Sequence, residues 1–124
     1  MTFVFLQLFL TVEQFSILNY RNETVETLRS RLIYQSKKRG ILENDILIGG
    51  FAEINSLKNL NYSQLIEYDK IINGEHNEWD LYYYLSGRKE LPADLKNSEV
   101  FKIIIDFVNE KKRRSFDKKK KIFV

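Results

Sequence analysis

The sequence predicts an all-α fold, a single small antiparallel bundle of about five helices. Three observations predict it. From Glu23 onward, apolar residues recur every three or four positions, the spacing of a helix with one buried face. The 124 residues contain one Pro and five Gly, so few positions interrupt a helix. No segment repeats at a fixed period and no Gly/Ser-rich linker divides the chain, so we expect one core.

The first helix is predicted from about Thr24 to Arg39. Its core-facing stripe contains Leu28, Leu32 and Gln35, with Val25 and Ile33 beside it. Cations fill the last turn before Gly40, where the helix dipole favours positive charge and glycine tolerates the left-handed conformation that ends many helices. We therefore expect the helix to stop at Gly40.

The second helix is predicted from about Leu42 to Leu57, with Glu43 and Asp45 near its positive end. The residues expected to face inward are Leu47, Gly50, Phe51 and Ile54. Gly49 and Gly50 are unusual, because each costs about 1 kcal/mol relative to alanine inside a helix. We interpret the pair as a place where a neighbouring helix packs closely, rather than as a functional site.

The third helix follows Asn61, whose side chain can cap it while Gln64 reaches back to complete a capping box. It stops near Gly74, and its expected buried residues are Leu65, Tyr68, Ile71 and Ile72. A fourth, aromatic helix begins around Asn77 and ends at Gly87. This helix carries Trp79, Tyr82, Tyr83 and Leu85.

The last helix is predicted from about Ser98 to Lys112, with Asn97 or Ser98 as its cap. Its contact positions are Val100, Phe101, Ile104, Ile105 and Val108. Residues 23–112 therefore form the predicted helical domain. Residues 113–124 form a basic tail that we expect to be solvated or disordered.

The role of residues 1–22 is unknown. The apolar run from Met1 to Leu18 is too short to span a bilayer, which needs about 20 predominantly apolar residues. It matches neither a secretory signal nor an arginine-rich mitochondrial transit peptide. A degenerate targeting segment, a terminal helix docked on the body and a misassigned gene start all stay open.

The charges are unevenly distributed. Residues 23–110 hold 11 Lys/Arg against 15 Asp/Glu, a net charge of −4. Residues 111–124 hold eight basic residues against Asp117 alone, a net charge of +7. The basic charge therefore belongs to the tail and says little about the partner of the folded body.

The residues offer little for catalysis. The chain has no Cys, which excludes disulfides, thiolate metal ligands and a cysteine nucleophile. His76 is the only histidine and is expected to be exposed in a turn, so one chain cannot build a His-based triad or a His/Cys metal site. No phosphate-binding loop is present and no carboxylates pair within a predicted cleft. We therefore expect a protein that is not an enzyme, with no metal and no stably bound cofactor.

Two surfaces stand out as contact sites. The first is the cationic turn at Arg39, Gly40 and Glu43, which helix capping and dipole effects can explain. A compatible interpretation is that a partner's backbone approaches Gly40 and meets the Arg39 guanidinium. The second is Trp79 with the Tyr82–Tyr84 run, which serves either as aromatic core or as an exposed interface anchor.

The order of the residues adds a resemblance. The stretch from Arg29 to Asn44 closely resembles the succinate dehydrogenase assembly factor 2 family, whose hallmark RGxxE motif is complete here as Arg39, Gly40 and Glu43. The match continues through Phe51-Ala52, Leu65 to Asp69, Ile72-Asn73 and Asn77 to Tyr83, and it covers about residues 26–111. Departures are Gly49-Gly50, the N-terminus and the basic run Lys118 to Lys121.

The resemblance implies a five-helix bundle that binds the flavoprotein subunit of succinate dehydrogenase and promotes covalent attachment of FAD to a histidine of that partner. FAD would stay with the partner, and this chain would act as a monomer, without nucleic acid or membrane. The expected compartment is the mitochondrial matrix, with the bacterial cytoplasm as the alternative. The expected partner-binding residues are Arg31, Lys38, Arg39, Gly40, Glu43, Trp79 and Asp80.

Two other classes of function stay open. One is a helical nucleic-acid-binding module that uses the first-helix cations and the tail. Its affinity would fall steeply with salt and would be lost on removal of residues 111–124. The other is an enzyme, which would need a cleft with carboxylates of perturbed pKa.

Overall fold

The computed structural model describes residues 23–54 and 56–122, and the open questions about residues 1–22 lie outside them. The helices are α3 (Val25–Lys37), α4 (Leu42–Glu53), the 3₁₀ turn η1 (Ser56–Asn59), α5 (Tyr62–Asn73), α6 (Glu78–Ser86), α7 (Ala93–Lys96) and α8 (Glu99–Ile122). The described residues contain no strand, so the all-α prediction is confirmed.

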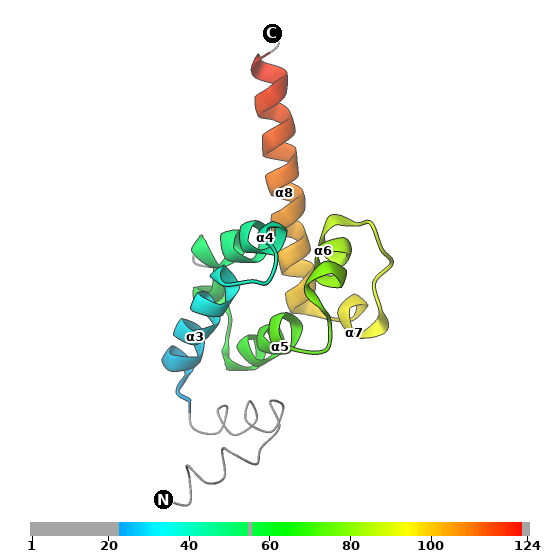
Figure 1. The fold of residues 1–124 in the computed structure, drawn as a ribbon. Helices are drawn as coiled ribbons and strands as arrows, with labels where there is room; N and C mark the ends of the chain where they lie inside the picture. Colours follow the sequence, from blue (N-terminus) through cyan, green and yellow to red (C-terminus); the bar gives the residue numbers. More distant parts are fainter. Residues whose placement is uncertain (1–22, 55, 123–124) are drawn as a thin grey trace, which may run out of the picture.

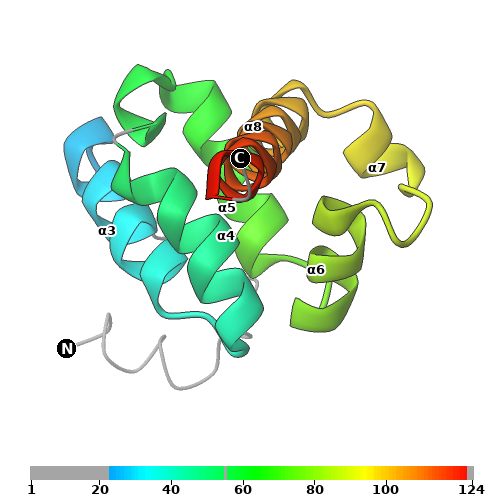
Figure 2. The ribbon, with the colours of Figure 1, turned by 90° about the horizontal axis from the view of Figure 1, so that it is seen from above.

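The helices surround the first half of α8. α3 packs against α4 and α5, and α8 contacts α4, α5, α6 and α7. Figure 2, a view along α8, shows α3 and α4 side by side on one flank and α6 with α7 on the other. The second half of α8 stands clear of the body (Figure 1). A small bundle thus carries one protruding helical arm.

One apolar core holds the bundle together. Its largest fully buried side chains are Tyr68, Phe51 and Phe101. The Phe51 ring stacks on Tyr68 with centroids 5.9 Å apart and meets Phe107 edge-on at 5.6 Å. Burying a large apolar side chain contributes about 1.5–3 kcal/mol, so this contact between α4, α5 and α8 is a major part of the fold's stability.

The expected buried residues of α5 and α8 are confirmed, with Ile105 only partly buried. In α3, Leu28 and Leu32 are buried, while Gln35 is half-buried and Val25 is exposed. The expected face of α4 was partly wrong. Phe51 is buried and Leu47 is partly buried against the core, as expected, and Gly50 is half-buried. Ile54 is 61% exposed, and the buried residues are Asn44, Ile48, Gly49, Phe51 and Ala52. The face is rotated because polar Asn44 is buried against α6, which hydrophobic periodicity cannot indicate.

The sequence predicted where helices begin more accurately than where they end. The Asn61–Gln64 capping box is present, and Asn77 and Ser98 cap α6 and α8. α4 ends at Glu53 instead of Leu57, where the separate turn η1 follows. α8 continues to Ile122, past the predicted end at Lys112. The tail expected to be solvated or disordered is therefore helical through Ile122, and its side chains through residue 119 are exposed. Ion pairs from Arg113 and Arg114 to Glu110 support this extension.

Gly40 does not end α3 in the predicted way. α3 stops at Lys37, and its cap Lys38 has φ −119° and ψ 69°. Among the described residues, the one glycine with positive φ is Gly87, which ends α6 as expected. A left-handed conformation is therefore not the reason for glycine at position 40.

Candidate functional site

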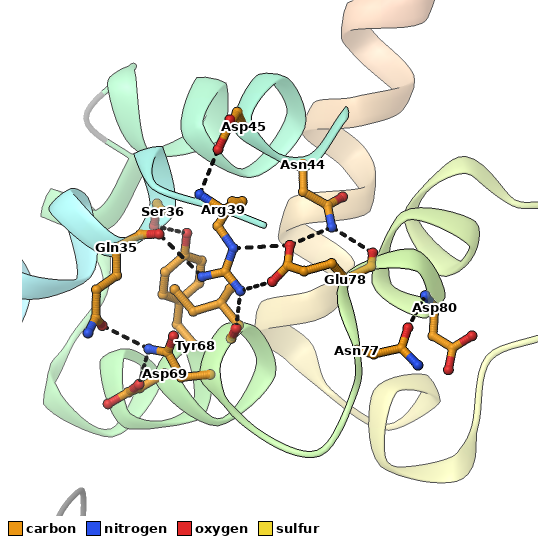
Figure 3. Close-up of polar contacts among 12 residues, drawn as sticks. Gln35, Ser36, Arg39, Asn44, Asp45, Tyr68, Asp69, Asn77, Glu78 and Asp80 are labelled. Carbon is orange, nitrogen blue, oxygen red and sulfur yellow. Dashed lines mark hydrogen bonds and ion pairs between the residues drawn. The ribbon is translucent and has the colours of Figure 1, made fainter. Parts of the chain in front are cut away.

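The turn between α3 and α4 holds Arg39 and Gly40, and Glu43 follows in the first turn of α4. Figure 3 shows the Arg39 side chain pointing inward, toward Glu78 at the start of α6. This side chain is only 6% exposed. The guanidinium is therefore a buried charge, which needs an opposite charge and hydrogen bonds to be tolerated.

The Arg39 guanidinium joins three helices. Its Nη2 donates to one carboxylate oxygen of Glu78 and to the carbonyl oxygen of Ile72 in α5. Its Nε donates to the other Glu78 oxygen at 3.3 Å, and its Nη1 donates to the carbonyl oxygen of Gln35 in α3 at 3.2 Å. The backbone N–H donates to Asp45 Oδ1 at 2.6 Å. The guanidinium donors that we expected to contact a partner thus form hydrogen bonds within the chain.

Glu78 also accepts hydrogen bonds from Asn44 of α4. Asn44 Nδ2 donates to Glu78 Oε2 at 2.9 Å and to the Glu78 backbone carbonyl at 2.7 Å. Asn44 is fully buried, and its Oδ1 has no hydrogen-bond partner among the described residues. One carboxylate therefore ties the start of α6 to both ends of the α3–α4 turn.

Gly40 lies against the same carboxylate side chain. Gly40 is exposed, yet a Cβ atom built on it would lie 3.2 Å from Glu78 Cγ and 4.0 Å from Glu78 Cδ. A contact of 3.2 Å is tighter than nearly all real Cβ contacts, so Glu78 would have to move. Glycine at this position leaves room for Glu78.

Exposed groups flank this buried network. Glu43 is half-buried, and its side chain makes no hydrogen bond or ion pair with the described residues. On α4, Leu42 is 68% exposed and Ile46 is 49% exposed, and on α6 Trp79 is 50% exposed. Large apolar side chains exposed near a rigid turn are typical of a protein–protein contact.

The rings of the aromatic helix α6 are partly buried or exposed, and Tyr84 packs against the core. Leu81 and Leu85 are buried, whereas the Trp79 ring is half exposed and lies beside Tyr82 and Tyr83, with centroids 6.3 and 6.2 Å away. Trp79 is thus an exposed residue supported by neighbouring rings, which keeps its position defined.

Asp80 makes contacts within and beyond α6. Its backbone N–H is capped by Asn77, and its carboxylate accepts a hydrogen bond from Lys89 at 3.0 Å. That hydrogen bond raises the pKa of Lys89. Because both side chains reach solvent, this ion pair is a weak one.

The other two predicted site residues lie apart from the Arg39 network. Arg31 binds Glu23 at 2.9 Å and Asp69 at 2.7 Å, between α3 and α5. Burial alone would lower the pKa of Arg31, but the hydrogen bonds to these carboxylates raise it. Lys38 is exposed, with its Nζ 6.0 Å from the centre of the Tyr34 ring.

The described residues contain neither a cluster of metal-ligating side chains nor a membrane-spanning helix. No group of three or more His, Asp or Glu side chains there could hold a metal ion, and no helix there is long and apolar enough to cross a bilayer. His76, expected to be exposed, has a side chain that is 15% exposed and pairs with Asp94 at 2.8 Å. This hydrogen bond lowers the pKa of Asp94. A hollow of about 490 Å³ lies elsewhere, lined by Ser63, Glu67, Lys70, Asp94 and their neighbours.

Comparison with known proteins places the chain. Residues 30–108, more than half of the sequence, match the family described as "Flavinator of succinate dehydrogenase". The chain belongs to this flavinator family. The succinate dehydrogenase assembly factor 2 of Caenorhabditis elegans is 54% identical over 90 residues, which are 73% of this chain and 75% of that protein. The Caenorhabditis briggsae protein of the same name is 56% identical, covering 73% of each chain.

A more distant relative in the flavinator family is assembly factor 2-A of Drosophila willistoni, 44% identical over 92 residues, 74% of this chain and 57% of that protein. All three relatives have names that end in "mitochondrial". The matched residues 30–108 contain the whole Arg39–Glu78–Asn44 network and the exposed Trp79. The family resemblance seen in the RGxxE motif is confirmed.

Sequence analysis missed two residues of this site, Glu78 and Asn44. Glu78 had a usable signal, because it opens α6 directly after its cap. Asn44, in contrast, lies between Glu43 and Asp45 in a polar stretch and does not stand out. Each could be explained locally, by the helix dipole or by solvent exposure, so neither pointed to the other. Their contact spans 34 residues and depends on tertiary packing.

Proposed function

We propose that this protein is an assembly factor that binds the flavoprotein subunit of succinate dehydrogenase and promotes covalent attachment of FAD to that subunit, in the mitochondrial matrix. The match of residues 30–108 to the flavinator family carries the proposal. The mitochondrial relatives named as succinate dehydrogenase assembly factors support the compartment and the process.

The proposed role is positioning rather than catalysis. Covalent flavin attachment uses the chemistry of the flavin and of the receiving side chain, and a helper protein accelerates it by holding the reacting groups in place. The α3–α4 turn suits that role, because Arg39 and Asn44 fix it to α6 while Glu43, Leu42 and Trp79 stay accessible. We expect one copy of this chain to bind through this face and to hold no cofactor of its own.

The test uses two glutamates of α4. Glu43→Ala is expected to reduce covalent flavin in the co-expressed flavoprotein at least tenfold, because a side chain with no partner among the described residues is free for the contact. The measurement is flavin fluorescence of the flavoprotein band in a denaturing gel. Glu53→Ala, an exposed residue at the other end of α4, is the matched control and should change nothing.

Both variants should unfold at the temperature of the unchanged protein, since neither side chain is fully buried. Equal flavinylation with Glu43→Ala, with Glu53→Ala and without the protein would overturn the proposed function. An equal loss of covalent flavin with both glutamate variants would show that Glu43 is not a specific contact residue.

A further inference from the structure

We propose that Glu78 is the positioning residue of the RGxxE turn, and that position 40 is glycine to make room for Glu78 rather than for a partner's backbone. The part of this inference that concerns partner binding rests on the proposed function. The part that concerns the conformation of the turn rests only on contacts within this chain.

The first step concerns how firmly Glu78 is held. Its carboxylate accepts from Arg39 Nη2 and Nε and from Asn44 Nδ2, and its backbone carbonyl accepts from Asn44 as well. Both donors are buried, Arg39 to 6% exposure of its side chain and Asn44 fully. Moving the carboxylate would leave the buried Arg39 cation without its opposite charge, with only the carbonyl oxygens of Gln35 and Ile72 as acceptors. It would also remove the carboxylate acceptor of Asn44. Both losses are unfavourable for buried groups.

The second step concerns Gly40. A Cβ at this position would lie 3.2 Å from Glu78 Cγ, a distance that requires the neighbour to yield by a few tenths of an ångström. A free glutamate at a surface could yield by changing rotamer. Glu78 cannot, because its carboxylate is fixed at the other end, so the glycine follows from an internal constraint.

The third step links this arrangement to binding. Arg39 leads directly into Gly40, and Asn44 directly follows Glu43, so one carboxylate holds both ends of the exposed segment 40–43. A segment held in its binding conformation loses little entropy when a partner binds. If the segment were in place in only about a tenth of the molecules, the affinity would fall about tenfold.

A double-mutant cycle tests the first half of the proposal without any partner. Gly40→Ala should lower the unfolding midpoint by roughly 4 °C or more in the unchanged protein. It should have no effect in the Glu78→Ala background, which lacks the Cγ atom. Equal midpoint shifts in both backgrounds would overturn the proposal. If Glu78→Ala does not fold, the Arg39→Leu/Glu78→Ala background, which has neither charge, replaces it.

A second measurement tests positioning. In Glu78→Gln, amide hydrogen exchange at residues 40–43 should accelerate, and affinity for the flavoprotein subunit should fall about tenfold. The control is Leu95→Ala, a core truncation in α7 that lowers overall stability away from the turn. It should leave exchange at residues 40–43 and affinity unchanged at a temperature where both variants are folded.

The outcomes separate the two proposals. Unchanged exchange at residues 40–43 in Glu78→Gln, or equal effects of Glu78→Gln and Leu95→Ala, would overturn the positioning role. Failure of the unchanged protein to bind the flavoprotein subunit would overturn the proposed function, while the cycle and the exchange measurement would still decide whether Glu78 fixes the turn.

Discussion

Tyr68 shows how single residues connect the core to the candidate site. Its ring is fully buried against Phe51, and its hydroxyl lies 2.5 Å from Ser36 Oγ. Ser36 donates its own proton to the carbonyl oxygen of Leu32, so Tyr68 is the donor to Ser36. Burial raises the pKa of Tyr68 to about 12, an effect that the positive charge of Arg39 reduces.

This shift predicts a loss of stability in alkali. Because the pKa of Tyr68 is higher in the folded protein, its contribution is complete below the unfolded pKa of 10.0 and is lost as pH rises from there toward about 12. The loss is about 3 kcal/mol at roughly 1.4 kcal/mol per pKa unit. Urea unfolding of the unchanged protein and of Tyr68→Phe between pH 9 and 12, a range chosen about this shift, measures it.

Phenylalanine cannot ionise, so the stability of Tyr68→Phe should fall less across this range. The unchanged protein, about 1 kcal/mol more stable at neutral pH, should therefore become less stable than the variant as its own loss approaches about 3 kcal/mol. Parallel pH curves for the two proteins would mean that Tyr68 does not titrate between these values. At neutral pH the variant should be about 1 kcal/mol less stable, because it lacks the Ser36 hydrogen bond.

At the residue scale, the sequence singled out Arg39 and Gly40 but did not indicate where the Arg39 side chain points. The partner contact of these residues stays a prediction, whereas the Arg39 side chain is 6% exposed and points inward. Its burial has a physical source that lies far away in the chain. The acceptors of Arg39 are Gln35, Ile72 and Glu78, and the last two lie 33 and 39 residues away, which no local pattern reports.

At the scale of elements, the adjacent glycines of α4 make different contacts. A Cβ on Gly49 would lie 3.3 Å from the carbonyl oxygen of Ser36 and 3.5 Å from Lys37 Cα. A Cβ on Gly50 would lie 3.5 Å from Lys111 Nζ and 3.6 Å from a Phe107 ring atom, which is ordinary contact with movable side chains. The expected close approach of a neighbouring helix is therefore found at Gly49, against the end of α3.

Two alanine substitutions should then have opposite effects. Gly50→Ala is expected to stabilise the protein by about 0.5–1 kcal/mol, because it removes the entropic cost of glycine in a helix. Gly49→Ala is expected to destabilise it by about 1–2 kcal/mol, since the backbone of α3 would have to move. Thermal unfolding of both variants measures this, and stabilisation by Gly49→Ala would show that α3 yields easily.

Elements were predictable where their signals are local. The Asn61–Gln64 pair fixed the start of α5 and Gly87 the end of α6, since a cap needs only its own neighbours. The end of α4 and the face that it buries were not predictable. Both depend on where α6 and α8 lie, and a buried asparagine cannot be distinguished from an exposed one by its spacing.

At the scale of the whole molecule, charge and packing divide the chain into a body and an arm. Residues 23–110 have a net charge of −4 and contain the core, while the second half of α8 carries most of the basic residues of the +7 C-terminal segment. Side chains 111–119 are exposed, with local ion pairs such as Arg113 to Asp117. Exposed pairs of this kind contribute little, about 0–1 kcal/mol each.

Ending the chain after Lys112 should therefore leave the body intact. We expect the unfolding free energy to change by less than about 1 kcal/mol, whereas Phe101→Ala in the buried half of the same helix should cost about 3–5 kcal/mol. Urea unfolding compares the two, and a truncation as costly as Phe101→Ala would show that the arm stabilises the body.

The same truncation distinguishes an electrostatic function from an assembly function. If nucleic-acid binding were the task of the protein, the arm would supply most of the phosphate contacts, and affinity would fall steeply with salt. Fluorescence anisotropy with a labelled duplex at two salt concentrations, for the full and truncated chains, tests this. We expect any duplex binding to be weak, suppressed by salt and absent from residues 1–112, because the Arg39 guanidinium is paired internally and residues 23–110 have a net charge of −4. Tight, salt-resistant binding by the truncated chain would instead mean that the acidic body itself recognises nucleic acid, which its net charge of −4 opposes.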